Sequence, residues 1–247
     1  MKASKSSLRE RKTIPTGLPE LDVLLGGGVF LRRIFMISGR YSCGKSTLAA
    51  LVAAEAQKMG YDAAWLDVEN RFNFDYFAGM GIDLEKLDYE NGLVAEEYFA
   101  YVHKWIEKHS GVIVLDSVAA LLTRNESEKE DGPSVPEVPK MIPNFLKKVT
   151  NELAAAKGDC ALIFLNHEKI DFDGALKVIG GRSVEHFVTQ WVRLRNMKMK
   201  PIKKGAQQIG DTIEASMKKD QNQYQNVQLE LIAGHGFRRP KALLATD

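Results

Sequence analysis

Cysteine is scarce in this sequence, and long apolar runs are missing from it. The 247 residues include only two cysteines, Cys43 and Cys160, which are too few for a disulfide framework and are typical of thiols in a reducing compartment. No apolar segment is long enough to span a bilayer, and the N-terminus does not read as a signal peptide. Internal repeats and low-complexity segments are also absent. These absences predict a cytoplasmic protein with no membrane partner.

Net charge is also low, at +2, but the two signs are distributed unevenly. Ten acidic residues lie between Asp62 and Glu97, whereas the stretch from Trp191 to Gly210 carries six basic residues and no acidic one. The first twelve residues hold five basic side chains against Glu10. Such asymmetry permits an anionic partner on one face, although lysines scattered on a solvated surface would give the same count.

Length and composition favour a single α/β domain with a sizeable core. Hydrophobic residues make up 45% and charged residues 27% of the chain, as in ordinary soluble domains. We expect a basic tail over residues 1–12, a core over residues 13–235 and a short C-terminal tail over residues 236–247.

The most informative stretch is GRYSCGKST, which matches the pattern G-x-x-x-x-G-K-[ST]. An apolar run, residues 34–37, precedes it, and a helical pattern follows it. Strand, glycine-rich loop and helix in this order are the context that a phosphate-binding loop requires. The predicted phosphate-binding residues are Gly39, Arg40, Tyr41, Ser42, Cys43, Gly44, Lys45, Ser46 and Thr47.

The chemistry of this loop predicts the phosphates of a nucleotide and Mg²⁺ as ligands. Gly39 and Gly44 allow a tight turn whose N–H groups point at one phosphate, and the following helix adds its positive N-terminal end. Lys45 is expected to reach the β- and γ-phosphates, and the Ser46 hydroxyl to be a Mg²⁺ ligand.

Three predicted buried strands end in polar side chains. Residues 63–69 (AAWLDVE) end at Glu69, a candidate general base that would polarise an attacking water. In residues 111–117 (GVIVLDS), the apolar run ends at Asp116, a candidate Mg²⁺ ligand. Residues 160–167 (CALIFLNH) end at His167, which could sense a γ-phosphate. The carboxyl ends of parallel strands meet at one edge of a sheet, so we expect these side chains to lie close together.

Two stretches have the composition of long loops, residues 124–139 and 168–181. Between them, residues 140–156 have helical periodicity, with Pro143 in the first turn. Ser183 is a candidate N-cap for a helix over residues 184–189. Strands are predicted at residues 191–196, 212–219 and 227–233, which would extend the sheet in an antiparallel sense. A basic hairpin or loop is expected at residues 198–210.

Five sequence motifs follow one another along the chain: TGLPELDVLLGGG at the start, then GRYSCGKST, WLDVEN, VIVLDSVAAL and ALIFLNH, with a Gly-Gly pair downstream. This order resembles the RecA family core. The likeness covers roughly residues 15–234. It implies a RecA-like P-loop fold: a mostly parallel central sheet flanked by helices, with an antiparallel C-terminal extension. The stand-alone size is similar to phage and plasmid recombinases of the RecA or UvsX type, or to short RadB-like proteins. It implies a bacterial or phage-infected host cell.

The resemblance implies roles for individual residues. Glu69 resembles the glutamate that activates water, and Tyr76 the aromatic residue that stacks on adenine. Residues 124–139 and 168–181 resemble the two DNA-binding loops, and Phe172, Val178 and Ile179 could wedge between bases. His167 falls where the family usually has a γ-phosphate-sensing glutamine. The implied DNA-contacting residues are Lys140, Lys147, Lys169, Phe172, Gly180, Gly181 and Arg182.

The resemblance also implies partners. The expected activity is that of a DNA-dependent ATPase of homologous recombination, which binds single-stranded DNA without sequence preference as an ATP-bound homo-oligomer or filament. Lys218 and Lys219 fall where RecA proteins project lysines at a neighbour's ATP. Here the two lysines are adjacent in the sequence. Successive residues of a strand face opposite ways, so only one of them can point at a phosphate of the neighbour's ATP. Alternatives are a RadB-like recombination mediator with weak ATPase activity, or a ring ATPase or helicase built on the same core.

Overall fold

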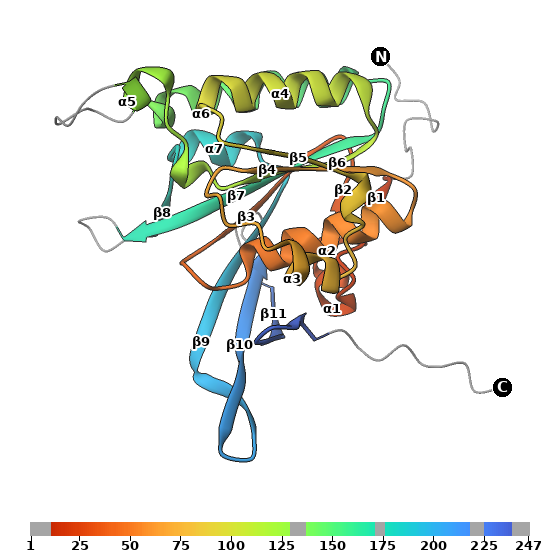
Figure 1. Cartoon of the computed structure of the whole chain (residues 1–247), viewed down its shortest axis with the longest axis vertical. Coiled ribbons are helices and arrows are strands. Elements are labelled where there is room, and N and C mark those ends of the chain that lie inside the picture. The colour runs from red at the N-terminus through yellow and green to blue at the C-terminus, as the bar shows by residue number, and fades with distance from the viewer. Residues whose placement is uncertain (1–10, 129–136, 171–175, 218–224, 239–247) are drawn as a thin grey trace.

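The computed structural model describes residues 11–128, 137–170, 176–217 and 225–238 of the chain (Figure 1). Its strands are β1 (Thr13–Ile14), β2 (Val29–Phe30), β3 (Ile34–Gly39), β4 (Asp62–Asp67), β5 (Leu87–Asn91), β6 (Gly111–Asp116), β7 (Cys160–Ile170), β8 (Leu176–Val178), β9 (Gln190–Lys204), β10 (Gln207–Met217), β11 (Asn226–Ile232) and β12 (Gly236–Phe237). Its α-helices are α1 (Pro19–Leu25), α2 (Lys45–Lys58), α3 (Phe74–Gly79), α4 (Ala95–Lys108), α5 (Arg124–Glu128), α6 (Val138–Ala155) and α7 (Arg182–Phe187).

One large sheet organises these elements. Its strand order is β12-β11-β10-β9-β3-β7-β6-β4-β5, and β8 pairs with β7 off this path. The strands from β9 to β5 in this order pair in parallel, whereas β10, β11 and β12 continue the sheet in an antiparallel sense. The predicted fold class, a mostly parallel sheet with an antiparallel C-terminal extension, is therefore confirmed.

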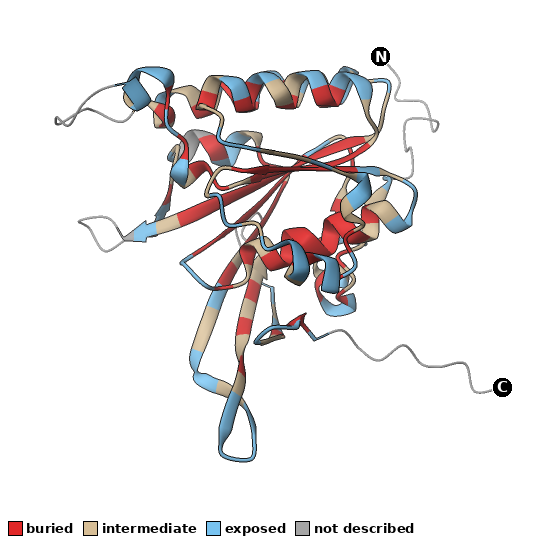
Figure 2. Cartoon of the chain, viewed as in Figure 1, coloured by how far each residue is buried: buried red, intermediate tan, exposed pale blue. Residues whose placement is uncertain are grey.

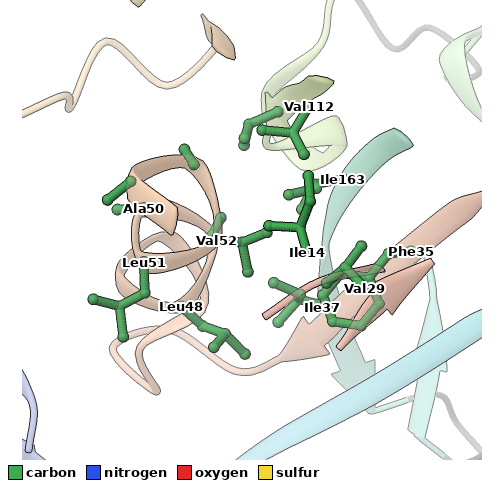
Figure 3. Close-up of a cluster of buried hydrophobic side chains, with 14 of the residues drawn as sticks. Ile14, Val29, Phe35, Ile37, Leu48, Ala50, Leu51, Val52, Val112 and Ile163 are labelled. Atoms are coloured by element: carbon green, nitrogen blue, oxygen red, sulfur yellow. The ribbon is translucent and has the colours of Figure 1, made fainter. Parts of the chain in front are cut away.

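Helices cover both faces of the parallel part, with α4, α6 and α7 on one side and α1, α2 and α3 on the other (Figure 1). Side chains of β3 alternate between two buried clusters. Phe35 and Ile37 pack with α2, whereas Ile34 and Met36 pack on the side of α4 and α6 (Figures 2 and 3). Because both faces are buried, the central strands are continuous apolar runs, which is the pattern that made them recognisable in the sequence.

Two helices follow directly from sequence periodicity. In α4, Tyr98, Val102 and Trp105 lie on one face and are buried in the second cluster. In α1, Gly26 ends the helix in the left-handed conformation, with φ of 75°, and its N–H bonds to the carbonyl of Val23.

The structure corrects the predicted loops. The stretch expected as a loop from Glu168 continues strand β7 to Ile170, and β8 pairs back on it, so its described part is a hairpin. The loop expected over residues 124–139 begins with α5 and ends inside α6. Since α6 begins at Val138, Pro143 lies inside that helix and not in its first turn. Helix α7 begins at Arg182 after an N-cap at Gly181, so the predicted Ser183 cap is wrong.

The sheet is also longer than expected at both edges. Strand β5 was not predicted because its sequence, LDYEN, lacks a continuous apolar run, as suits an edge strand. Strand β9 runs on to Lys204 and forms with β10 a long hairpin that extends away from the helices (Figure 1). Gly236 and Phe237 form β12, which pairs with β11 in the same sheet and was not predicted.

Candidate active site

The phosphate loop lies between β3 and α2, as predicted, and two of its glycines are required by close contacts. A Cβ atom at Gly39 would approach the carbonyl oxygen of Leu194 to 2.4 Å. At Gly44, where φ is 88°, a Cβ atom would lie 2.8 Å from the ring of Phe237. Strands β9 and β12, distant in sequence, therefore restrict this loop to glycine at both ends.

Lys45 is buried and its ammonium group is turned back onto the loop. Its Nζ donates to the carbonyls of Gly39, at 3.2 Å, and Arg40, at 2.9 Å. Burial lowers the pKa of Lys45 from its ordinary value. A phosphate in the loop would offer this cation stronger acceptors than two neutral carbonyls.

Glu69 lies two residues beyond β4 and is held from two sides. The hydroxyl of Ser117 donates to its Oε1 at 2.5 Å, and His167 Nε2 lies 3.0 Å from the same oxygen. Its Oε2 lies 3.8 Å from Nη1 of Arg71. The hydrogen bond from His167 is the largest cause that lowers the pKa of Glu69 to about 2.

His167 connects the candidate base to the phosphate loop. Its Nδ1 lies 3.4 Å from Nζ of Lys45, which can only donate, and its Nε2 faces the carboxylate of Glu69, which can only accept. These two neighbours favour a ring proton on Nε2, which faces Glu69. The ring of Tyr41 covers the imidazole at a centroid distance of 4.3 Å.

Asp116 ends β6 beside Ser46, as the sequence predicted. The Ser46 hydroxyl donates a hydrogen bond to the carboxylate, while burial is the main reason that the pKa of Asp116 is raised to about 7. A hydroxyl and a carboxylate are hard oxygen donors of the kind that Mg²⁺ takes alongside nucleotide phosphates. The residues present therefore fit a magnesium site.

The remaining loop residues surround a cleft of about 210 Å³, which is also lined by Phe72 and Phe77. Arg40 and Tyr41 are exposed, and Ser42 adopts a φ of 57°. Burial raises the pKa of Cys43, whose Sγ donates to the carbonyl of Arg40. Tyr76 on α3 brings its hydroxyl to 3.4 Å from the Thr47 hydroxyl, so this aromatic residue lies beside the first turn of α2.

Sequence reasoning missed two members of this cluster, Ser117 and Arg71. Ser117 directly follows Asp116, and Arg71 is two residues from Glu69, so only their nearness to predicted residues was a signal. Asp67 fixes the turn that carries Arg71: its two carboxylate oxygens accept from the backbone N–H groups of Arg71 and Phe72, at 3.1 and 2.9 Å.

Part of the predicted DNA-contacting set lies on α6 and on the β7–β8 hairpin. Lys140 and Lys147 are both exposed on α6 and are seven residues apart, which places them on one face of the helix. A Cβ atom at Gly180 would lie 3.2 Å from Ile142, so the base of the β7–β8 hairpin packs on α6. Lys169 is exposed on that hairpin, two residues after His167, and Gly181 is exposed at its base.

Other predicted residues cannot be placed or lie elsewhere. Phe172, Lys218 and Lys219 fall outside the described residues, and of Arg182 only the backbone, at the start of α7, is described. Val178 is buried in the second cluster, and Ile179 is bound through both its backbone groups by the side-chain amide of Asn166. The suggested wedging of Val178 between bases is therefore wrong for this conformation.

Among the described residues, no helix combines the length and apolar character needed to cross a bilayer.

Comparisons with known proteins show the family of this chain. The family model described as the RecA N-terminal domain matches residues 1–238. Protein RecA of Chloroflexus aurantiacus is 31% identical over 97% of this chain and 70% of its own length. Protein RecA of Synechococcus sp. (strain CC9902) is 30% identical over 99% of this chain and 66% of its own, and that of Paenarthrobacter aurescens is 30% identical over 94% and 69%. The chain belongs to the RecA family.

Proposed function

We propose that this protein is a DNA-dependent ATPase of homologous recombination, which binds single-stranded DNA as an ATP-bound oligomer or filament and promotes pairing or strand exchange. The observation that carries the proposal is the position of His167. It contacts Lys45 and Glu69 in the cleft, and it lies on the strand that continues into the β7–β8 hairpin. The proposed nucleotide sensor is thus one residue from Glu168, which pairs with Val178 in the candidate DNA-contacting hairpin.

In the proposed reaction, ATP places its phosphates in the loop between β3 and α2. Lys45 exchanges the carbonyls of Gly39 and Arg40 for phosphate oxygens. Asp116 and Ser46 would hold Mg²⁺, which neutralises phosphate charge when it is bound. Glu69 orients a water for attack and accepts its proton once the γ-phosphate competes for the hydrogen bond from His167.

DNA binding in this proposal is sequence-independent. Lys140 and Lys147 are exposed on α6, against which the base of the β7–β8 hairpin packs, and Lys169 is exposed on that hairpin. In this proposal the three side chains contact phosphates rather than base edges. The β9–β10 hairpin offers a second group of exposed cations, Lys198, Lys200, Lys203 and Lys204. ATP held between two subunits, with Lys218 or Lys219 of one reaching the nucleotide of the other, belongs to the same proposal.

The test is steady-state ATP hydrolysis with and without single-stranded DNA at two salt concentrations. Stimulation that fades as salt rises supports the proposal, because phosphate contacts release counterions. Turnover that DNA does not change would contradict it and would favour a recombination mediator or a ring ATPase. The matched variant Arg182→Ala should weaken DNA binding and spare ATP binding, and retained DNA affinity would remove Arg182 from the interface.

A further inference from the structure

Arg71 combines a fixed backbone with an exposed side chain beside the candidate base. The carboxylate of Asp67 binds the N–H groups of Arg71 and Phe72, and it also accepts from the Tyr89 hydroxyl at 2.9 Å. Two of these bonds hold the turn between β4 and α3, and the third fixes the Asp67 carboxylate from β5. The side chain of Arg71 is 74% exposed, and its ion pair with Glu69 is long, at 3.8 Å.

The guanidinium group lies at the same cleft as the phosphate loop. Arg71 lines the cleft of about 210 Å³ together with Lys45, Ser46 and Asp116. It also lines a second hollow of about 230 Å³, which shares Tyr41, Glu69 and Arg71 with the cleft. A cation at this boundary faces the place where the terminal phosphate of a nucleotide and the attacking water would meet.

The charges around the cleft leave a role for a second cation. Lys45 is the cation next to the loop backbone. Two acidic side chains, Glu69 and Asp116, line the same cleft. A γ-phosphate carries more negative charge than the carboxylate of Glu69, so it competes for a guanidinium held only by a long, exposed ion pair. Since Ser117 and His167 both hold Oε1 of Glu69, departure of Arg71 from Oε2 frees that oxygen for water.

We propose that Arg71 is a catalytic residue that stabilises the transferring γ-phosphoryl group in cis, within the subunit that binds the ATP. This role rests on the ATP hydrolysis proposed above. The water oxygen bonds to the γ-phosphorus, and its proton passes to Glu69. The bond from the γ-phosphorus to the bridging oxygen breaks, and its electron pair stays on ADP. Arg71 exchanges no proton; its fixed positive charge faces the γ-oxygens as negative charge shifts during transfer.

The first experiment separates turnover from binding. Arg71→Ala should lower kcat by roughly 100-fold or more, as loss of such a cation does elsewhere, and change ATP affinity by less than about threefold. Arg71→Lys should recover part of the loss, and guanidinium ion added to Arg71→Ala should raise its rate. Arg33→Ala, an exposed arginine at the opposite end of β3, is the control and should match the parent. A kcat within about threefold of the parent for Arg71→Ala would overturn the proposal.

A mixing experiment tests the cis assignment. Arg71→Ala retains the phosphate loop, and Lys45→Ala retains Arg71, so mixed oligomers would regain activity only if Arg71 reached a neighbour's nucleotide. We expect no recovery at any ratio. Recovery that rises with the fraction of Lys45→Ala subunits would overturn action in cis.

A third measurement does not depend on turnover. Affinity for ADP with aluminium fluoride, a mimic of the transferring phosphoryl group, should exceed affinity for ADP in the parent. Arg71→Ala should lose most of that difference while it binds ADP alone normally. If the parent protein does not hydrolyse ATP but shows this difference in affinity, and Arg71→Ala loses it, the proposed ATPase activity is contradicted and the assignment of Arg71 stands. An unchanged difference in Arg71→Ala would overturn the assignment alone.

Discussion

The active-site cleft and the β9–β10 hairpin hold their charged side chains in opposite ways. In the cleft, Lys45 and Glu69 are connected through His167, and each has additional partners at short distances. On the hairpin, Lys203 and Lys204 are exposed at its far end, near the turn. A connected, partly buried network makes each member dependent on the others, whereas exposed charges act nearly independently through a screened field. Single substitutions should therefore have large effects in the cleft and small, additive effects on the hairpin.

Substitution of Lys45 in the phosphate loop should cause the largest loss of ATP hydrolysis. Lys45→Ala removes the cation that faces the phosphates, and we expect ATP hydrolysis to fall at least about 1,000-fold, consistent with the size of preorganised electrostatic effects. Steady-state hydrolysis checks this. The midpoint of thermal unfolding should not fall, because the change removes a desolvated charge whose pKa burial already lowers. Hydrolysis that persists in the purified variant would show that another cation serves the phosphates.

Replacement of His167 should have an intermediate effect and should depend on the new side chain. His167→Ala disconnects Lys45 from Glu69, and we expect kcat to fall by roughly 10- to 100-fold. His167→Gln should restore much of the activity, since an amide can accept from Lys45 and donate to Glu69 at once. Both variants are compared in the presence and absence of single-stranded DNA. Equal activity of the alanine and glutamine variants would contradict the bridging role.

Protonation of Asp116 should weaken magnesium binding in a defined pH range. The folded-state pKa of this carboxyl is raised to about 7, so its charged form dominates above pH 7 and is lost as the pH falls below it. Since Mg²⁺ requires the charged form, its affinity should fall about tenfold per unit below pH 7. Turnover measured against Mg²⁺ concentration at pH 6 and pH 8 checks this, with Asp116→Asn as the control. A Mg²⁺ requirement that is the same at both values would contradict it.

Neutralising the hairpin should have the smallest effect per residue. Lys203→Gln and Lys204→Gln should each weaken DNA binding a few-fold and lower the slope of log affinity against log salt by about 0.7 to 0.9 for every DNA phosphate that the variant no longer neutralises. DNA-independent hydrolysis should stay unchanged, because neither side chain lines the cleft. Binding titrations at three salt concentrations provide the measurement. A drop in affinity in the double variant that far exceeds the sum of the two single effects would show a connected site instead.

Segments with a strong hydrophobic pattern were predicted more reliably than polar segments. Runs such as VIVLD and LIFLN predicted buried strands correctly because a strand covered on both faces is apolar throughout. The edge strand β5 and the β7–β8 hairpin were missed. Their polar sequences form strands only because a neighbouring strand supplies hydrogen bonds, as β4 does for Leu87 to Asn91. Pro143 was placed in a first turn because the prolines and charges before it hid the start of α6.

Sequence by itself determined the phosphate loop, the carboxylates at the ends of β4 and β6, and the fold family, because each depends on local chemistry at fixed spacing. Tertiary structure alone decided which side chains meet. Ser117 reaches Glu69 across 48 residues and His167 reaches it across 98, distances along the chain that no local pattern encodes. Parallel strands bring such residues together because their carboxyl ends share one edge of the sheet. The exposed position of Arg71 beside this edge likewise follows from the turn that Asp67 holds, and not from its place in a motif.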